Sequence, residues 1–434
     1  MSESAAVSNS EAELPLLSAP RAQVHLVSSP EELVPVIQSL NESQGAVAID
    51  AERASGFKYS QRAYLIQLKA KDGPIFLIDP TSNPDIATSI QFAELKKVLG
   101  DREWILHAAT QDLPCLAELG LQPGAIFDTE LASRLAGQAR VGLGSLTENL
   151  LGYRLAKEHS AADWSTRPLP KEWLNYAALD VDVLHELAQA VLNLLIEQNK
   201  SEWAKEEFES LLGFSPKVQR VDKWRGITGL HKVQDRMSLE IARCLWVARE
   251  SLAQKMDIAA GRLIPDSSIL AAAMEKPKSR PELAAMKSFR GRASRSYLDH
   301  WWEAVSSALR ANELPAIKPE KTGALPNHRN WINKFPDADR RLKFAKEKLG
   351  ALCEELNLPL ENLLTPEYLR QICFTPPQSI SVQSIANRLL ELGARKWQVK
   401  NTAEVIAAEF NRAETVQDDQ PAADLQEQDE HGEL

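Results

Sequence analysis

The chain has 434 residues, is 44% hydrophobic and carries a formal net charge of −10. This length predicts two or three domains. No apolar stretch approaches the roughly 18 residues that cross a bilayer, and the N-terminus lacks the basic start and apolar core of a signal peptide, so we expect neither a membrane partner nor export. The four cysteines form neither a metal-binding pattern nor a disulfide framework, which favours a reducing cytoplasm; they are Cys115, Cys244, Cys353 and Cys373.

The negative charge is unevenly distributed. Residues 414–434 contain eight acids and no Lys or Arg, and residues 1–20 contain three acids and no Lys or Arg. Residues 21–200 have a net charge of −7, from 16 basic and 23 acidic side chains, whereas residues 201–413 have 34 basic and 26 acidic ones and a net charge of +8. An acidic half followed by a basic half suits a centre that cleaves a polyanion beside a module that binds one. Solvated helical surfaces are the alternative.

Residues 1–20, rich in Ser, Ala and Glu, are predicted to be disordered. Residues 21–200 alternate strand-like and helix-like patterns. The expected strands are 22–29, 45–50, 63–70, 74–80 and 103–108, and the expected helices are 31–40, 92–99 and 112–119. Short turns join the second, third and fourth strands, which predicts an antiparallel meander within a mixed sheet that has helices on both faces.

From residue 128 onward the pattern is almost entirely helical. A long amphipathic helix is expected at 232–257, and further helices at 336–356, 365–372 and 380–393. Proline breaks and a segment rich in Pro and Gly separate two helical blocks. The predicted division is a disordered segment 1–20, a domain of strands and helices 21–212, a helical domain 221–312, a linker 313–327, a second helical domain 328–412 and a disordered acidic tail 413–434.

Five residues in three short segments carry the chemistry: Asp50, Glu52, Asp112, Tyr176 and Asp180. Residues two apart on a strand share a face, so the first two acids should point the same way. The last two are four apart in a helical stretch and should share a helical face. Carboxylate oxygens are the ligands that Mg²⁺ and Mn²⁺ prefer, and two such ions can assist in-line attack on a phosphodiester.

The segments VAIDAE, HAATQDLPCL with FDTELASRLAG, and ADWSTRPLPKEWLNYAALDV resemble the three exonuclease motifs of the ribonuclease D family, in the tyrosine branch of the DEDD 3′–5′ exonucleases. The resemblance covers about residues 22–200. Residues 229–273 resemble the HRDC domain that follows in that family. The resemblance implies a nuclease domain of ribonuclease H-like fold followed by two all-α HRDC-like domains, of which the second matches only loosely.

The resemblance also implies roles for the five residues. Asp50 and Glu52 would bind two divalent metal ions, Mg²⁺ or Mn²⁺, with Asp112 and Asp180 completing the ligand set. Tyr176 would position the attacking water. The alternatives are a solvated strand end for the first pair, a helix cap for Asp112, a half-buried aromatic for Tyr176 and a surface acid for Asp180. The neighbouring Asp182 and the more distant Asp128 are interpreted as structural.

Candidate substrate contacts are weaker. His107 could touch the terminal nucleotide or belong to the core, and Ala109 stands where the family usually has a HAG or HGA sequence. Trp164 could stack on a base or join a loop to the core, and Arg167 could pair with a phosphate. Phe57 and Tyr59, in the segment after Glu52, are candidate base wedges.

A basic face is expected in the first helical domain, with a solvated helical surface as the alternative. Its members are Lys276, Lys278, Arg280, Arg290, Arg292 and Arg295, with Arg225, Lys232 and Arg236 as weaker ones.

The predicted function is metal-dependent 3′–5′ exoribonuclease activity that trims RNA 3′ ends, such as those of tRNA precursors, and releases nucleoside 5′-monophosphates. The chain is expected to act as a cytoplasmic monomer. Two alternatives stay open: an exonuclease that acts on DNA, and a catalytically dead RNA-binding protein. A contact with a 2′-hydroxyl would distinguish RNA from DNA.

Overall fold

The structure is a computed structural model that describes residues 14–156, 161–214, 222–318 and 325–418. Among these residues, no helix is both long and apolar enough to cross a membrane. The chain packs into two compact units. The first contains the described residues within Met1–Ala125, Arg154–His185 and Gly213–Lys321, and the second contains those within Ile126–Tyr153, Glu186–Leu212 and Thr322–Leu434.

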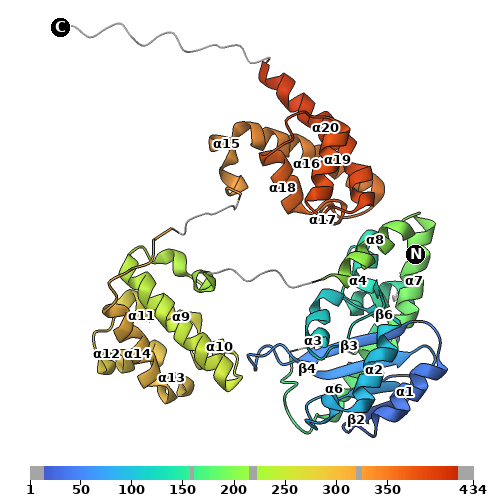
Figure 1. Ribbon diagram of the computed structural model, residues 1–434, viewed down its shortest axis with the longest axis horizontal. Coiled ribbons are helices and arrows are strands. Elements are labelled where there is room, and N and C mark those ends of the chain that lie inside the picture. Colours follow the sequence, from blue (N-terminus) through green and yellow to red (C-terminus); the bar gives the residue numbers. More distant parts are fainter. Residues whose placement is uncertain (1–13, 157–160, 215–221, 319–324, 419–434) are drawn as a thin grey trace, which may run out of the picture. The chain divides into compact units, whose positions relative to one another are not determined.

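Six strands form one mixed sheet in the order β2-β5-β4-β3-β6-β7 (Figure 1). Strand β3 (Val47–Arg53) pairs antiparallel with β4 (Ala63–Ala70), and β4 pairs antiparallel with β5 (Ile75–Ile78). Strands β2 (Val24–Val27) and β6 (Glu103–Leu106) join β5 and β3 in parallel. The predicted antiparallel meander is therefore confirmed, and so is the mixed character of the sheet.

Three short strands were not predicted. Strand β7 (Ala125–Asp128) completes the sheet, and the two-residue strands β1 (Leu16–Leu17) and β8 (Arg154–Leu155) pair in parallel. Two residues are too few to establish an alternating pattern, and the four residues of β7 run directly into a helix that begins at Thr129. The pairing of β1 also corrects the expected disorder of residues 1–20, because apolar Leu16 and Leu17 find a partner strand; residues 1–13 lie outside the described part.

Helices cover the sheet, because the central strands β3, β4 and β5 are buried along nearly their whole length. Helix α6 (Lys171–Asp182) packs on all three of them. Helices α1 (Leu33–Glu42), α2 (Ile90–Gly100) and α3 (Leu113–Glu118) stand where helices were predicted. The other helices before residue 213 are α4 (Thr129–Leu135), α5 (Leu143–Leu146), α7 (Leu184–Glu197) and α8 (Ser201–Leu212).

A buried carboxylate fastens the end of α6 to the sheet. Asp182 accepts hydrogen bonds from the backbone N–H of Arg21 at 2.9 Å and from Nζ of Lys69, on β4, at 2.7 Å. Burial alone would raise the pKa of Asp182, but the hydrogen bonds from Arg21 and Lys69 outweigh it and lower the pKa. Asp182 thus holds the helix that carries Tyr176 and Asp180.

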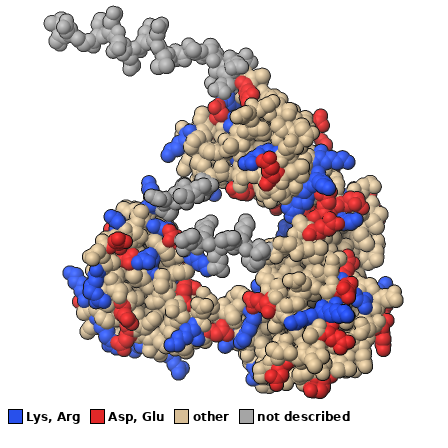
Figure 2. Space-filling model, viewed as in Figure 1, with Lys and Arg blue, Asp and Glu red and all other residues tan. Residues whose placement is uncertain are grey.

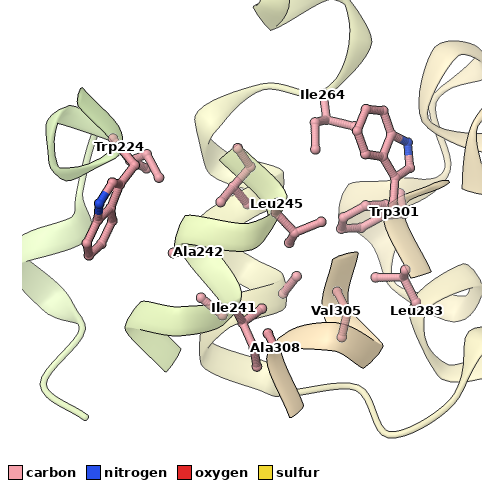
Figure 3. Packing of buried hydrophobic residues seen from close by; sticks show 14 of the residues in the cluster. Trp224, Ile241, Ala242, Leu245, Ile264, Leu283, Trp301, Val305 and Ala308 are labelled. Carbon is pink, nitrogen blue, oxygen red and sulfur yellow. The ribbon is translucent and has the colours of Figure 1, made fainter. Parts of the chain in front are cut away.

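The first helical region has its own apolar core (Figure 3). Ile241 and Leu245, on the long helix α9 (Arg236–Met256), are fully buried with Trp301 and Val305 of α14 (Leu298–Leu309). The indole N–H of Trp301 donates to the backbone oxygen of Ser294 at 3.1 Å, so its polar atom is satisfied inside the core. The shorter helices between them are α10 (Ala260–Leu263), α11 (Asp266–Glu275), α12 (Arg280–Ala285) and α13 (Arg292–Ser296).

The second helical region repeats this order of elements at a spacing of 100 residues. Helices α9 and α16 (Pro336–Leu356) both have 21 residues, and each ends at a residue in the left-handed conformation, Asp257 or Asn357. A four-residue helix follows in both cases, α10 and then α17 (Leu360–Leu363). The remaining helices are α15 (Trp331–Lys334), α18 (Pro366–Phe374), α19 (Val382–Glu391) and α20 (Lys396–Asp418).

The overall prediction of a mixed sheet flanked by helices, followed by helical regions, is confirmed. The four cysteines are free thiols, as expected. One boundary differs: α20 continues to Asp418, beyond residue 413, where a disordered tail was predicted to begin. Residues 419–434 lie outside the described part.

Replacing Asp182 with Ala should destabilise the protein by about 3 kcal/mol, because Lys69 would then be nearly buried without its partner. The free energy of unfolding in urea measures this. Because folding lowers the pKa of Asp182, its contribution to stability depends on pH. The contribution is complete above the unfolded pKa of about 3.9 and is lost as the pH falls through the folded value. Asp85→Ala, at an exposed acid, is the control and should change stability by no more than about 0.5 kcal/mol. Equal stability of both variants at neutral pH would contradict the assignment.

Candidate active site

The two acids of the first motif lie within a central strand. Asp50 is opposite Gln67 and Glu52 is opposite Leu65 in the pairing of β3 with β4. Because the strand continues to Arg53, these acids do not stand at a solvated strand end. Their spacing of two puts both carboxylates on the same face of the sheet. Glu52 is buried, whereas Asp50 keeps partial contact with solvent.

Helix α6 brings a third carboxylate to this face. One carboxylate oxygen each of Asp50, Glu52 and Asp180 lie within 4.8 Å of one another. Tyr176, one helical turn before Asp180, shares a hydrogen bond with it. The strand spacing and the helix spacing therefore converge on one cluster.

Asp112 joins the cluster from the start of α3. It occupies the N-cap position of that helix, but its side chain makes no capping hydrogen bond. Instead its carboxyl shares a hydrogen bond with Asp50, and its charge acts on Glu52. The side chain of Asp112 therefore does not act as a helix cap. Asp128 does cap α4, by accepting from the backbone N–H groups of Glu130 and Leu131.

The electrostatics of the cluster oppose negative charge on three of its carboxyls, those of Asp50, Glu52 and Asp180. Burial raises the pKa of Asp50. Burial, followed by the charges of neighbouring acids, raises the pKa values of Glu52 and Asp180 well above the ordinary range. Carboxyls that repel one another at this range are stabilised as anions by bound cations. The donor set, made of carboxylate oxygens, fits hard ions such as Mg²⁺ or Mn²⁺.

The phenol of Tyr176 stays protonated at neutral pH. Burial, and then the negative charges of Asp180 and Glu52, raise its pKa above the ordinary value of 10. A protonated phenol donates and accepts hydrogen bonds but does not serve as a strong base. The residue is therefore suited to orienting a reactant beside the carboxylates.

One contact of the site was not predicted. Gln67, on β4, is fully buried, and its amide Nε2 donates to Oε1 of Glu52 at 3.4 Å. Its own carbonyl oxygen is buried and has no hydrogen-bond partner within the described residues. A Gln in the middle of the apolar segment AYLIQLKA is the signal that could have pointed to it.

The segment between β6 and α3 contains a strained backbone. His107 directly follows β6 and is partly buried. Ala108 adopts φ 60° and ψ 53°, a left-handed conformation that costs a residue with a Cβ about 1–2 kcal/mol. Ala109 is fully buried. A glycine at position 108 would relieve the backbone strain, and a glycine at position 109 would leave more space in a buried position.

Two candidate substrate contacts are engaged inside the protein. Trp164 is fully buried and its ring lies 5.5 Å from that of Trp173 and 6.5 Å from that of Tyr176, centroid to centroid. Arg167 donates to Asp79 at 2.7 Å and to the hydroxyl of Thr81 at 2.6 Å. These placements favour the loop-to-core interpretation of Trp164 and a similar fastening role for Arg167.

The candidate base wedges both contact the first helical region. The guanidinium carbon of Arg262 lies 3.9 Å from the centroid of the Phe57 ring. Tyr59 packs against the apolar core of that region. These contacts join residues about 200 positions apart in the sequence, which no local pattern predicts.

The predicted basic face is divided by ion pairs. Lys276 pairs with Asp235 at 3.0 Å, and Arg280 pairs with Asp299. Of the others, Arg290 bonds to a backbone oxygen of its own region. Figure 2 shows basic and acidic side chains interspersed over the described parts of the chain rather than one continuous basic surface on the face in view. The exposed members that form no ion pair within the described residues are Lys278, Arg290, Arg292 and Arg295.

Two of the weaker basic candidates hold the chain that follows α14. Arg225 donates to the backbone oxygen of Ala316 at 2.8 Å, and Arg236 donates to that of Pro315 at 3.1 Å. Both therefore fasten the beginning of the predicted linker 313–327, of which residues 319–324 lie outside the described part.

Three protein-family models match the chain. A 3′–5′ exonuclease model matches residues 24–196, an HRDC domain model matches residues 238–305, and a model named 3′ to 5′ exonuclease C-terminal domain matches residues 324–410. The first range contains all five residues of the cluster, and the other two cover the two helical regions.

Named relatives extend the match over most of the chain. Ribonuclease D of Zymomonas mobilis subsp. mobilis is 30% identical over 309 residues, which are 69% of this chain and 77% of that protein. A crystal structure of a protein from Bifidobacterium adolescentis is 35% identical, with a TM-score of 0.83, and covers 92% of this chain and 100% of that one. Escherichia coli RNase D has the same fold, with a TM-score of 0.64 at 21% identity, over 90% of this chain and 99% of that one. The chain belongs to the ribonuclease D family and is a 3′–5′ exoribonuclease.

Proposed function

We propose that the chain trims the 3′ ends of structured RNA, foremost tRNA precursors, by hydrolysis that uses two divalent metal ions. The proposed metal ligands are Asp50, Glu52, Asp112 and Asp180, and Tyr176 is the proposed positioning group for the attacking water. The products would be a nucleoside 5′-monophosphate and an RNA shorter by one nucleotide. The observation that carries the proposal is the convergence of three carboxylates within 4.8 Å.

The ligand set supports the metal part of the proposal. Four carboxyls from β3, the start of α3 and α6 meet on one face of the sheet, and burial together with mutual repulsion raises the pKa values of three of them. When bound, two divalent ions would stabilise both the attacking and the leaving oxygen of an in-line displacement. Gln67 orients Glu52 by donating to Oε1.

The remaining groups hold the reactants. Tyr176 keeps its proton, so its hydroxyl can orient a water or a phosphate oxygen beside Asp180. Trp164, in the segment that leads into α6, packs against Trp173 and Tyr176 of that helix and so helps to keep the phenol in place. The protein therefore supplies fixed hydrogen-bonding groups and negative ligands, and no strong protein base is needed.

The substrate class follows from the family and from the helical regions. The two helical regions that follow the nuclease part offer surface for the folded body of an RNA. A monomeric state and a cytoplasmic location stay predictions.

Asp50→Ala or Asp180→Asn should lower Mg²⁺- or Mn²⁺-dependent trimming by about 10³-fold or more, since several kcal/mol of transition-state stabilisation would be lost. RNA binding in a filter assay should be nearly unchanged. Glu172 is an exposed acid on α6, the helix that carries Asp180. The variant Glu172→Gln is the matched control and should stay active. Retained trimming in the Asp50 variant would contradict the ligand assignment.

The same cluster predicts a dependence of stability on metal and pH. Because folding raises the pKa values of Asp50, Glu52 and Asp180, the metal-free protein should lose stability as the pH rises from about 4 through the raised values. Added Mn²⁺ should restore it, with a gain in melting temperature that grows with pH. Asp180→Asn should reduce both effects. A gain with Mn²⁺ that is equal in this variant and in the wild type would place the ions elsewhere.

Tyr176→Phe should lower kcat by about 10²-fold, the lower end of what a positioned proton-transfer or orienting group contributes. The Mn²⁺-dependent gain in melting temperature should persist in this variant, because the carboxylates are intact. An unchanged kcat would contradict the positioning role of the phenol.

RNA preference is tested by digesting an RNA oligomer and the DNA oligomer of the same sequence in parallel, and a tRNA precursor beside mature tRNA. We expect the RNA oligomer and the precursor to be shortened from their 3′ ends. Faster digestion of the DNA oligomer would contradict the proposed substrate.

A further inference from the structure

The segment that leaves the active-site strand is held by the first helical region. We call Ala54–Arg62, which joins β3 to β4, the β3–β4 loop; it begins two residues after Glu52. We call residues 257–262, from the end of α9 into α10, the α9–α10 turn. Hydrogen bonds and a ring contact join this loop to this turn, and both belong to the first compact unit.

The carboxylate of Asp257 binds one end of the β3–β4 loop. Its Oδ1 accepts from the backbone N–H of Ser60 at 2.8 Å, and its Oδ2 accepts from the hydroxyl of Tyr64 at 3.4 Å. The same carboxylate forms an ion pair with Arg62 at 3.7 Å. One side chain of the helical region thus binds the backbone of the loop and two side chains at its end.

Arg262 and Ala259 bind the tip of the loop, which is formed by Gly56 and Phe57. The backbone N–H of Ala259 donates to the oxygen of Phe57 at 2.9 Å, and Nε of Arg262 donates to the oxygen of Gly56 at 2.7 Å. The guanidinium carbon of Arg262 also lies 3.9 Å from the centroid of the Phe57 ring, a cation–π contact. Backbone and ring are therefore fixed together.

The tip of the loop is close in sequence to the acidic cluster, since Phe57 follows Glu52 by five residues. The backbone N–H groups of Phe57 and Lys58 both donate to the oxygen of Ala54 at 2.8 Å, which folds the tip back toward the end of β3. Ala54 is fully buried and follows Glu52 by two residues. Any displacement of the tip thus acts on a segment directly continuous with the strand that carries Asp50.

The conformation of the turn explains why an acid can stand there. Asp257 has φ 49° and ψ 48°, a left-handed conformation that Asp and Asn tolerate better than most residues. Its counterpart 100 residues later, Asn357, has φ 47° and ψ 61°. In the second compact unit the backbone oxygen of Asn357 accepts from Nζ of Lys200, which also donates to Leu135. The equivalent turn of each helical region therefore contacts elements that precede residue 213.

We propose that the α9–α10 turn positions the β3–β4 loop for catalysis, with Asp257 and Arg262 as positioning residues that fix Phe57 beside the 3′ end of the RNA. The inference rests on the proposed function in placing that 3′ end at Asp50 and Glu52. It assigns the first helical region a part in the hydrolytic step, in addition to any contact with the body of the RNA.

The test uses the full chain and three variants. Asp257→Gly removes the carboxylate and keeps the left-handed backbone; Arg262→Gln removes the guanidinium; Asp257→Asn keeps an acceptor for the N–H of Ser60. The controls are Asn357→Gly, at the equivalent turn of the second helical region, and Arg310→Gln, an exposed basic residue of the first helical region that is not part of the predicted basic face. Melting temperatures identify any variant that does not fold.

Two readouts separate positioning from binding. The first is amide hydrogen exchange of residues 54–62, which reports the loop whether or not the catalytic assignment is correct. The second is single-turnover hydrolysis of an RNA trinucleotide, which offers few phosphates to a basic surface, compared with a long RNA.

We expect about tenfold faster exchange of the loop in Asp257→Gly and Arg262→Gln, and about 10- to 100-fold slower trinucleotide hydrolysis, as small displacements in an active site produce. Asp257→Asn should stay near the wild type, as should both controls on the trinucleotide. Unchanged exchange and trinucleotide hydrolysis, with weaker long-RNA binding, would overturn the proposal in favour of a binding role alone. Faster exchange with unchanged hydrolysis would also overturn it. If instead Asp50→Ala stayed active, the proposed function would fail while the exchange result still stood.

Discussion

The repulsion among buried carboxyls is the constraint on which the rest of the structure depends. Asp50, Glu52 and Asp180 are held so close that burial and mutual charge raise their pKa values. Such a cluster persists only where the surrounding fold fixes its members. The central position of β3 and the packing of α6 on the sheet provide this, and Asp182 with Lys69 fastens α6 from its far end. Stability outside the cluster thus offsets strain within it.

The sequence predicted each pair of the cluster because the geometry within a pair is local, whereas the meeting of the pairs was implied by the family resemblance. A spacing of two on a strand and of four on a helix decides which side chains share a face, and the structure places Asp50 with Glu52 and Tyr176 with Asp180 accordingly. The meander of β3, β4 and β5 could be predicted as well, because β3 and β4 have seven and eight residues and all four residues of β5 are apolar. Strands β1 and β8 have only two residues each, and β7 has three apolar residues followed by Asp128.

Contacts between distant segments escaped prediction. The bond between Ser60 and Asp257 joins residues 197 apart, and Gln67 meets Glu52 only through strand pairing. Residue type alone also did not indicate that Arg167, a natural phosphate ligand, donates to Asp79 and Thr81. The 100-residue repeat of the helical regions is visible in the helix lengths and in the left-handed residues at the helix ends, and not as a run of identical residues. These features depend on which elements meet, and a single sequence does not contain that information.

The most direct measurement of the central claim is anomalous diffraction from crystals of the full chain soaked in Mn²⁺. The account predicts two peaks about 3.5–4 Å apart, each coordinated by carboxylate oxygens of the set Asp50, Glu52, Asp112 and Asp180. Peaks at other carboxylates, or none at this cluster under conditions in which the protein trims RNA, would contradict it.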